Sequence, residues 1–327
     1  MNNKQTTIKD SVSLEGVGIH TGKDVKLTFL PAKENTGYIF KRVDLDDKPE
    51  VEALAKYVVN TQRGTTLEKD GIKLKTTEHV LAALVGLEID NIVIEINAEE
   101  PPIMDGSSKF FVDALEKAGL QELSTLRKEY IVKDIISFND PDSGSEITLI
   151  PCENYQITTM VDYETKVLGT QNATLTKLSE FKDEFSNART FSFLHEIEML
   201  LENNLIKGGD LNNAIVYVDK KISENTMEKL KKAFNKDKVS VKSNGILDNL
   251  NLHHQNEAAR HKLLDVLGDL ALIGRRIKGK VIAKKPGHFI NTQFAKKVSG
   301  IIEKEERLNM NKQEYNEKAL MDAEQIM

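Results

Sequence analysis

The sequence repeats one order of predicted elements twice, and this repetition limits the fold more than any other feature. Each copy begins with a strand that ends at a proline and an Asx turn, followed by a helix with apolar residues at i, i+3 and i+4. A short β-branched strand, a glycine turn and a second amphipathic helix complete the copy. These elements occupy residues 26–35, 76–86, 91–96 and 107–118 in the first copy and residues 146–154, 259–274, 279–283 and 292–304 in the second.

Four matches in the same order indicate an internal duplication. It predicts an α+β protein of two similar domains, each with helices packed on an antiparallel sheet. We place the first domain at residues 1–127 and the second at 128–300, with 301–327 as a charged tail or linker. The second copy is longer by about 62 residues between equivalent landmarks, so we expect insertions there.

The composition of the chain argues against several classes of function. Apolar residues make up 39% and charged residues 29% of the chain, and no apolar run reaches the roughly 18 residues of a membrane span. The net charge of -6, without Trp or a basic stripe, argues against a nucleic-acid partner. The chain starts with polar residues and has no signal peptide, which predicts a cytoplasmic protein. The single cysteine, Cys152, fits this compartment and argues against a thiolate-rich structural zinc site.

Candidate metal ligands lie on the predicted helices. His261 and Asp265 are four residues apart and therefore share one helix face, which Asp269 continues beside buried leucines. Taken alone, this spacing favours an ordinary surface pair. The equivalent helix of the first half carries Glu78 and His79 in its first turn, and a pseudo-twofold arrangement would bring His79 toward the pair. Two imidazoles and one carboxylate would make a catalytic zinc site with a fourth position for water.

Two further side chains could move protons. Glu78 could accept a proton from the reacting water, and it would also be stabilised by the dipole at the start of its helix. His288 follows a glycine turn from which its side chain could reach a cleft between the domains, although a lone loop histidine is more often a surface residue. We leave the other histidines out of the site, namely His20, His195, His253 and His254.

Five motifs occur in one order over about residues 4–300: TTEHVLAAL at 76–84, IMDGS at 103–107, ARTF at 188–191, RHKLLDVLGD at 260–269 and GH at 287–288. Together they resemble the zinc-dependent UDP-3-O-acyl-N-acetylglucosamine deacetylases, the LpxC family of lipid A biosynthesis. The resemblance implies an active site between two similar α+β domains. It also implies hydrolysis of the N-acetyl group of UDP-3-O-(3-hydroxyacyl)-N-acetylglucosamine, which releases acetate.

The resemblance assigns an expected role to each residue at these positions. One Zn²⁺ would be held by His79, His261 and Asp265. Glu78 would act as the general base, and His288, oriented and charge-stabilised by Asp269, would assist the oxyanion and the leaving amine. On the substrate side, Thr190 would polarise the acetamide carbonyl, Lys262 would contact the sugar or phosphates, and Phe191 would lie along the sugar.

The insertions of the second half would recognise the acyl chain. In the family an inserted βαβ element forms an apolar passage, and its expected parts here are residues 191–194, a helix to Leu205, residues 207–209 and residues 214–218. An ordinary small core would need the same apolar residues. The stretch at 220–256 departs from the family's compact form, and its charged segment at 224–238 has no functional account.

The C-terminal residues 301–327 include eleven charged side chains, so most faces of a helix there would be solvated. Residues 320–327 resemble the linker that joins this deacetylase to a 3-hydroxyacyl-[acyl-carrier-protein] dehydratase, so we expect the first part of a longer fusion protein. Two alternative functions stay open. One is a zinc hydrolase of a different acylated amino sugar, and the other is a non-catalytic duplicated α+β binding module.

Overall fold

In the computed structural model, the two halves of the chain form two five-stranded sheets with the same strand order. The structure describes residues 3–202, 207–208, 213–220, 222, 228, 230–231, 239–248 and 250–324. The first sheet is ordered β2 (Val12–Val17), β3 (Asp24–Pro31), β9 (Ile92–Ile96), β4 (Tyr38–Arg42) and β5 (Glu50–Glu52). The second is ordered β12 (Ile136–Asp140), β13 (Ser145–Ile150), β19 (Lys280–Lys284), β14 (Gln156–Asp162) and β15 (Thr170–Leu175). The predicted α+β class and duplication are confirmed.

Both sheets are mixed, which corrects the predicted antiparallel sheets. The strand β9 runs antiparallel to β3 but parallel to β4, and β19 runs antiparallel to β13 but parallel to β14. Each central strand follows a long crossover that includes a helix, and such a crossover returns the chain to the sheet in the direction of the earlier strand. The limits of the two domains stay predictions.

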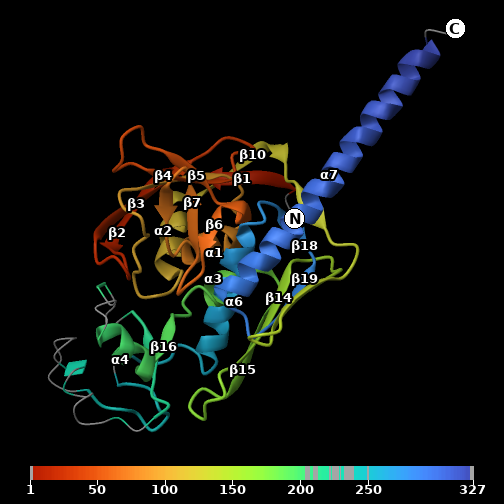
Figure 1. Ribbon diagram of the computed structural model, residues 1–327. Helices are drawn as coiled ribbons and strands as arrows, with labels where there is room; N and C mark the ends of the chain where they lie inside the picture. Colours follow the sequence, from red (N-terminus) through yellow and green to blue (C-terminus); the bar gives the residue numbers. More distant parts are fainter. Residues whose placement is uncertain are drawn as a thin grey trace.

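Two helices, one from each half, pack together in the interior (Figure 1). They are α1 (Glu78–Gly86) and α6 (Glu257–Ala271), and the apolar residues of both are buried except the partly buried Val85. The contact is close at Gly268, where an added Cβ would overlap the backbone carbonyl of Glu78. The strands at residues 92–96 and 280–284 therefore follow helices that share one central interface.

The second helix of each half is α2 (Lys109–Ala118) and α7 (His288–Glu324). α7 is much longer than the helix predicted at 292–304, because it begins at His288 and continues through the predicted tail as a rod that leaves the body of the molecule (Figure 1). No proline or glycine follows Gly300, and the abundant Glu and Lys are good helix formers. The side chains at 303–312 are exposed, as the charged sequence predicts.

The remaining elements lie outside the two five-stranded sheets. The first half also contains η1 (Ala55–Tyr57) and an unpredicted three-stranded sheet of β6 (Val58–Asn60), β7 (Thr66–Lys69) and β8 (Ile72–Leu74). Two pairs of strands join distant segments: β1 (Lys4–Ile8) with β10 (Leu120–Leu126), and β11 (Glu129–Ile131) with β18 (Arg276–Lys278). The second half adds η2 (Leu178–Glu180) and α3 (Phe181–Glu184).

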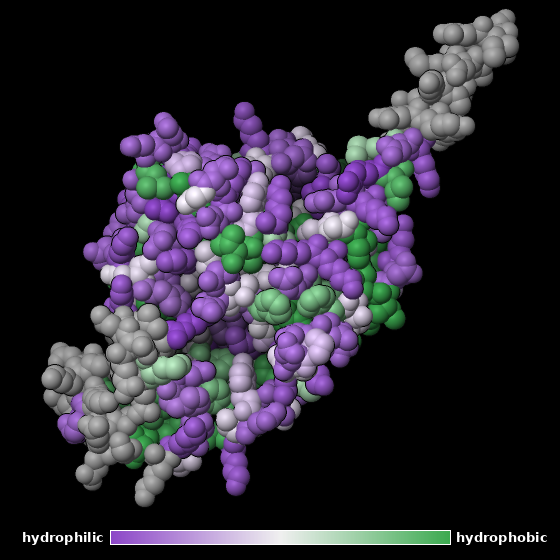
Figure 2. Space-filling view, in the orientation of Figure 1, coloured by the Kyte–Doolittle hydropathy of each residue, from purple (hydrophilic) through white to green (hydrophobic). Residues whose placement is uncertain are grey.

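The insertion of the second half contains the predicted βαβ order. It consists of β16 (Phe191–Phe193), α4 (Leu194–Glu202) and β17 (Ile215–Tyr217), and the two strands are parallel. Figure 2 shows a mainly hydrophilic face that is hollowed between this insertion and the rest of the molecule. The predicted helix end at Leu205, Gly209 and the charged segment 224–238 lie outside the described residues, apart from 228, 230 and 231.

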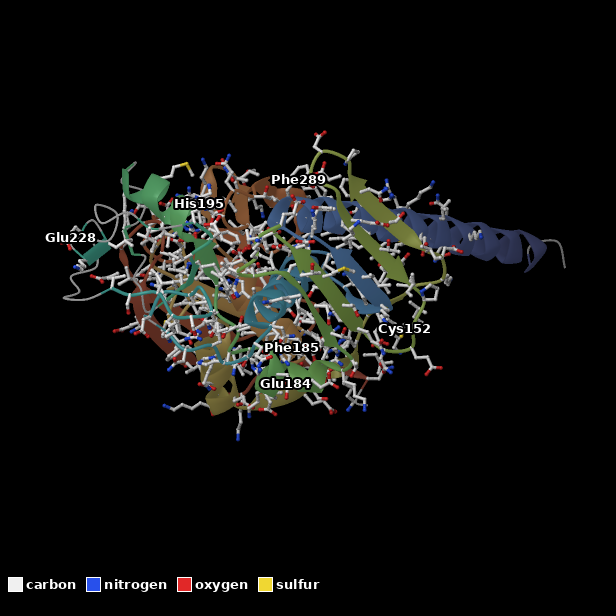
Figure 3. All side chains as sticks on the ribbon, turned by 90° about the horizontal axis from the view of Figure 1, so that it is seen from below. Cys152, Glu184, Phe185, His195, Glu228 and Phe289 are labelled. Carbon is white, nitrogen blue, oxygen red and sulfur yellow. The ribbon has the colours of Figure 1, made fainter. Side chains whose placement is uncertain are left out.

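Two residues mark opposite parts of the second half in Figure 3. His195 lies on α4 in the insertion, whereas Cys152 follows the second sheet's strand β13.

Within the described ranges, no helix is long and apolar enough to cross a membrane.

Candidate active site

The first turn of α1 carries two polar residues into the interior. Glu78 and His79 are 2% and 5% exposed, and the five residues that follow, 80–84, are apolar and fully buried. These apolar residues fix the helix against its neighbours, so the polar first turn is held at the edge of the core. Buried groups of this kind need partners, and the partners come from the other half of the chain.

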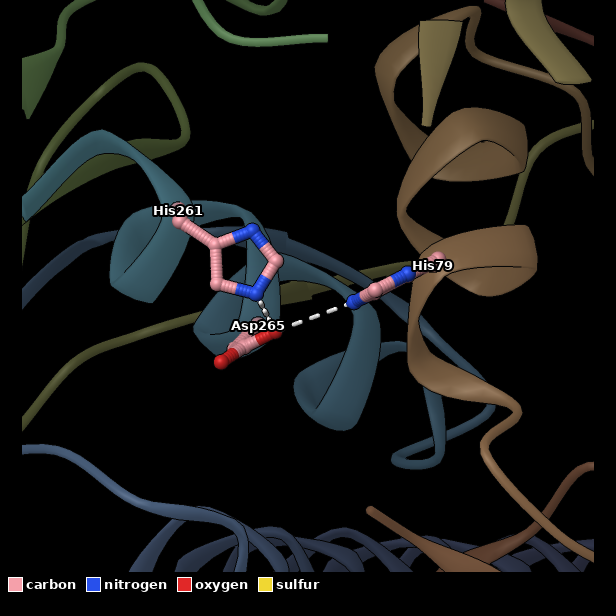
Figure 4. A group of neighbouring side chains, drawn as sticks. All are labelled: His79, His261 and Asp265. Carbon is pink, nitrogen blue, oxygen red and sulfur yellow. Dashed lines mark ion pairs between the residues drawn. The ribbon is translucent and has the colours of Figure 1, made fainter. Parts of the chain in front are cut away.

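His79 meets His261 and Asp265 of α6, as the sequence predicts (Figure 4). One ligand atom from each residue can be chosen such that all three lie within 4.8 Å of one another. The Nε2 atoms of His79 and His261 lie 3.7 and 3.4 Å from Oδ1 of Asp265. We call these three side chains the metal triad.

The metal triad fits a divalent cation. In Asp265, the atom Oδ1 is buried and has no hydrogen-bond partner among the described residues. The other carboxylate oxygen, Oδ2, accepts a hydrogen bond from Lys262 Nζ at 2.7 Å. Burial opposes ionisation of this carboxyl group, but interactions with the His261 ring, when that ring is protonated, and with the Lys262 ammonium hold the pKa of Asp265 well below its usual range. A buried carboxylate oxygen without a donor, placed between two imidazole nitrogens, is a donor set suited to a metal ion.

The orientation of His261 also suits a ligand. Its Nδ1 lies 3.0 Å from the carbonyl oxygen of Ala188, so Nδ1 carries the proton and Nε2 keeps its lone pair toward Asp265. Burial lowers the pKa of His261 to about 4, so the ring is neutral near pH 7. A neutral imidazole is the form that binds metal.

A second group of titratable side chains adjoins the triad. The His288 ring directs Nδ1 toward Oδ2 of Asp269 at 3.0 Å and Nε2 toward Oε1 of Glu78 at 3.9 Å. The same Nε2 lies 4.0 Å from Oδ2 of Asp265, so this group faces the metal triad. The structure thus brings together the predicted proton-transfer residues.

The electrostatics of this second group separate an acid from a base. Burial alone would lower the pKa of His288, but the surrounding carboxylates, Asp269 foremost, raise it to about 9. Burial is the main cause that raises the pKa of Glu78 above its ordinary value. Both shifts favour proton transfer near neutral pH, because they keep His288 charged and make the Glu78 carboxylate a stronger base.

Two of the predicted substrate residues, Phe191 and Lys262, lie beside the triad. The Phe191 ring is 6.3 Å from the ring of His261, and Lys262 Nζ lies 5.6 Å above the Phe191 ring. Thr190 is fixed by its backbone, which donates to Gly106 O and accepts from Ile215 N. Lys262, predicted to contact substrate, is already paired with Asp265. Burial would lower the pKa of Lys262, but the negative charge of Asp265 helps to raise it above its ordinary value.

Two residues that orient this site were not predicted from the sequence. Thr65 donates its backbone N–H to Glu78 Oε2 at 2.9 Å and its hydroxyl to Asp269 Oδ1 at 2.5 Å. Asn291 donates to Asp269 Oδ2 at 2.8 Å. Neither belongs to a motif with an evident chemical spacing, so only the tertiary contact reveals them.

A third orienting contact involves the predicted ARTF motif. Arg189 forms a buried ion pair with Glu257 at 2.8 Å, at the start of α6. The pair therefore fixes the segment that carries Ala188, the backbone partner of His261.

The histidines that we left out belong to other contacts. His20 pairs with the buried Glu100, His195 with Asp219, and His253 and His254 with Asn187. Over the described residues, a metal-like cluster of His, Cys, Asp and Glu occurs only twice, in the triad and in the group of Glu78, Asp269 and His288.

A separate cavity of about 380 Å³ lies between the two halves at the other ends of α1 and α6. Its walls include Val85, Leu270 and Arg276, and it contains none of the predicted site residues. This cavity is therefore separate from the candidate site, which is marked by its buried titratable residues.

Comparison with known proteins agrees with this geometry. The family model described as LpxC, UDP-3-O-acyl N-acetylglycosamine deacetylase, matches residues 5–239 and 225–300. The chain belongs to the LpxC family. The resemblance seen in the five motifs is thereby confirmed, and the triad is the candidate metal site of a metal-dependent deacetylase family.

Relatives in the LpxC family are of two kinds. The bifunctional enzyme LpxC/FabZ of Bacteroides thetaiotaomicron is 46% identical over 90% of this chain, and that of Porphyromonas gingivalis is 44% identical over 93%. The chain spans 64% and 66% of the length of these two relatives. The UDP-3-O-acyl-N-acetylglucosamine deacetylase of Saccharophagus degradans is 38% identical, with 89% of this chain and 88% of the relative covered.

Proposed function

We propose that this chain hydrolyses the N-acetyl group of UDP-3-O-(3-hydroxyacyl)-N-acetylglucosamine and releases acetate, in lipid A biosynthesis. The observation that carries the proposal is the contact between the two halves, which sets the metal triad beside Glu78 and His288. Amide hydrolysis needs an activated water, stabilisation of an oxyanion and a proton for the leaving amine. These side chains can supply the proton for the leaving amine directly. They can also support the activation of the water and the stabilisation of the oxyanion.

Zn²⁺ is the proposed metal, held by His79, His261 and Asp265. When bound, zinc would lower the pKa of water to about 7 and polarise the acetamide carbonyl. A set of two imidazoles and one carboxylate leaves one coordination position open, as catalytic zinc sites do.

Glu78 and His288 divide the proton transfers in this proposal. Thr65 holds Oε2 of Glu78, so Oε1 is the atom that takes the proton from the attacking water. His288 Nε2 then donates a proton to the amine nitrogen as the C–N bond breaks, and Asp269 keeps the ring oriented through Nδ1. The products are acetate and the free amino sugar nucleotide.

Substrate recognition is proposed for the neighbouring side chains. Thr190 would donate its hydroxyl to the acetamide oxygen, Phe191 would lie along the sugar, and Lys262 would contact the sugar or phosphates. The pairing of Lys262 with Asp265 supports a further effect, because its charge also stabilises the ionised ligand. The βαβ insertion would hold the hydroxyacyl chain.

Metal analysis combined with an activity assay tests the proposal. We expect about one zinc per chain, acetate release from UDP-3-O-acyl-N-acetylglucosamine, and loss of that release with a chelator. Properly folded protein that lacks both metal and activity would refute it. Much slower release from UDP-N-acetylglucosamine, which has no acyl chain, would separate this function from a zinc hydrolase of another amino sugar.

A longer fusion protein and a cytoplasmic location also remain proposals. The bifunctional names and greater lengths of two relatives support the fusion. The intact mass of the protein in its own cell tests it, since a mature chain that ends at Met327 would rule it out.

A further inference from the structure

Glu100 is a buried carboxylate outside the proposed machinery. Its side chain is fully buried in the segment that follows β9, yet it meets five donor groups. The backbone N–H groups of His20 and Thr21 lie 3.0 Å from Oε2, and the Thr21 hydroxyl donates to the same oxygen at 3.1 Å. The ring Nδ1 of His20, at 2.7 Å, and the Thr76 hydroxyl, at 2.9 Å, reach Oε1.

This set of donors stabilises the charged form of Glu100. Burial raises the pKa of this carboxyl group, but hydrogen bonds from His20, Thr76 and Thr21 outweigh burial and leave the pKa below its ordinary value. Hydrogen bonds to an ionised acceptor are stronger than those between neutral groups. Glu100 therefore holds two segments together through hydrogen bonds, one at residues 20–21 and one at Thr76.

One of these segments leads into the proposed active site. Thr76 lies two residues before Glu78 and has a φ of 51°, a left-handed conformation that a β-branched residue rarely adopts. Such a conformation is energetically unfavourable and persists only where the surroundings hold it. The surroundings here are Glu100, which binds the Thr76 hydroxyl, and Glu99, whose carbonyl accepts from Lys75 N at 2.7 Å.

The other segment is the loop that contains His20 and Thr21. It leaves no space for a side chain at Gly18, where a Cβ would approach Glu100 Oε2 to 2.7 Å. The loop also contacts the insertion, because Gly208 N donates to Ile19 O at 3.0 Å. Glu100 thus lies between the start of α1 and a loop that touches the acyl-binding insertion of our proposal.

We propose that Glu100 is a positioning residue: its carboxylate holds the left-handed turn at Thr76, and this turn sets the direction in which Glu78 and His79 enter the site. The inference rests on the proposed function for its effect on turnover, but its effect on metal affinity does not require a substrate. A merely structural role would lower the free energy of unfolding and leave both properties of the folded protein unchanged.

Glu100→Gln tests the inference, because it keeps the shape but gives the donors one acceptor oxygen in place of two. We expect kcat to fall about 10- to 100-fold with KM changed less than about 3-fold, and zinc affinity, measured by chelator competition, to fall about 10-fold. Glu99→Gln is the matched control, since the half-buried Glu99 side chain pairs with Lys75 at 3.2 Å, and we expect less than a twofold change. Values of kcat and zinc affinity within twofold of wild type in Glu100→Gln would overturn the inference.

Thr76→Val provides a second route that does not depend on the folding of Glu100→Gln. It removes the hydroxyl and keeps the shape, so it should lower kcat and zinc affinity in the same direction. If Glu100 acts through Thr76, the double variant loses less than the product of the two single losses. Independent, multiplied losses would contradict the proposed route. Absence of deacetylase activity in the wild type would refute the proposed function alone, because the zinc measurements would still decide the role of Glu100.

Discussion

The central helices α1 and α6 occupy equivalent places in the two halves, yet they contribute differently to the site. α1 supplies Glu78 and His79 from its first turn, whereas α6 supplies His261, Asp265 and Asp269 from successive turns along one face. The duplication therefore provides a symmetric frame and an asymmetric set of side chains. Neither half holds a complete metal triad, so the site exists only when the two helices pack together.

Loss of a metal ligand from either helix should have the largest effect. His79→Ala on α1 and His261→Ala on α6 should each reduce bound zinc to well below one per chain and lower kcat/KM by more than about 10³-fold. Elemental analysis and acetate release measure both effects. If either variant kept stoichiometric zinc at wild-type affinity, the triad would not be shared between the halves.

Glu78→Gln sharpens the contrast within α1, because Glu78 and His79 are neighbours with different proposed roles. We expect kcat to fall about 10²- to 10⁴-fold as the base is lost, while zinc content stays near that of the wild type. Parallel metal analysis and kinetics check this separation. Near-normal turnover would show that Glu78 is not the base.

Asp269→Asn tests the contribution of α6 to proton transfer. Because the Asp269 carboxylate stabilises the charged ring of His288, its removal should lower the pKa of His288 by about 1 to 3 pH units. The charged ring persists below the pKa and is lost as the pH rises through it, which in the wild type occurs at about 9. NMR titration of the His288 ring in metal-free protein measures this directly, and an unchanged midpoint would contradict the pairing.

Gly268→Ala alters the helix contact itself and should have the smallest effect of these five substitutions. The added Cβ would overlap the Glu78 backbone, so we expect the free energy of unfolding to fall by about 1–3 kcal/mol. Gly300→Ala in α7 is the control, since nothing lies within 4 Å of its Cβ position and alanine is the better helix former by about 1 kcal/mol. Denaturant unfolding should show opposite signs, and equal effects would mean that α1 and α6 do not pack closely at Gly268.

Much of this asymmetry could be predicted from the sequence. The i, i+4 spacing placed His261 and Asp265 on one face, and the repeated order of elements indicated which helix would face them. The parallel strand in each sheet was missed, because a hydrophobic pattern carries no strand direction. The roles of Thr65 and Asn291 depend on hydrogen bonds between segments that are distant in the sequence. The length of α7 depends on the absence of a helix-ending residue in the stretch that we predict to be a tail.

In the proposed site, the two halves of the chain share one metal ion. An anomalous difference map at the zinc absorption edge, from a crystal of the zinc-loaded protein, would locate this ion. We expect one strong peak per chain at about 2.0–2.2 Å from His79 Nε2, His261 Nε2 and a carboxylate oxygen of Asp265. A principal peak bound by residues of only one helix, or located away from the triad, would contradict it.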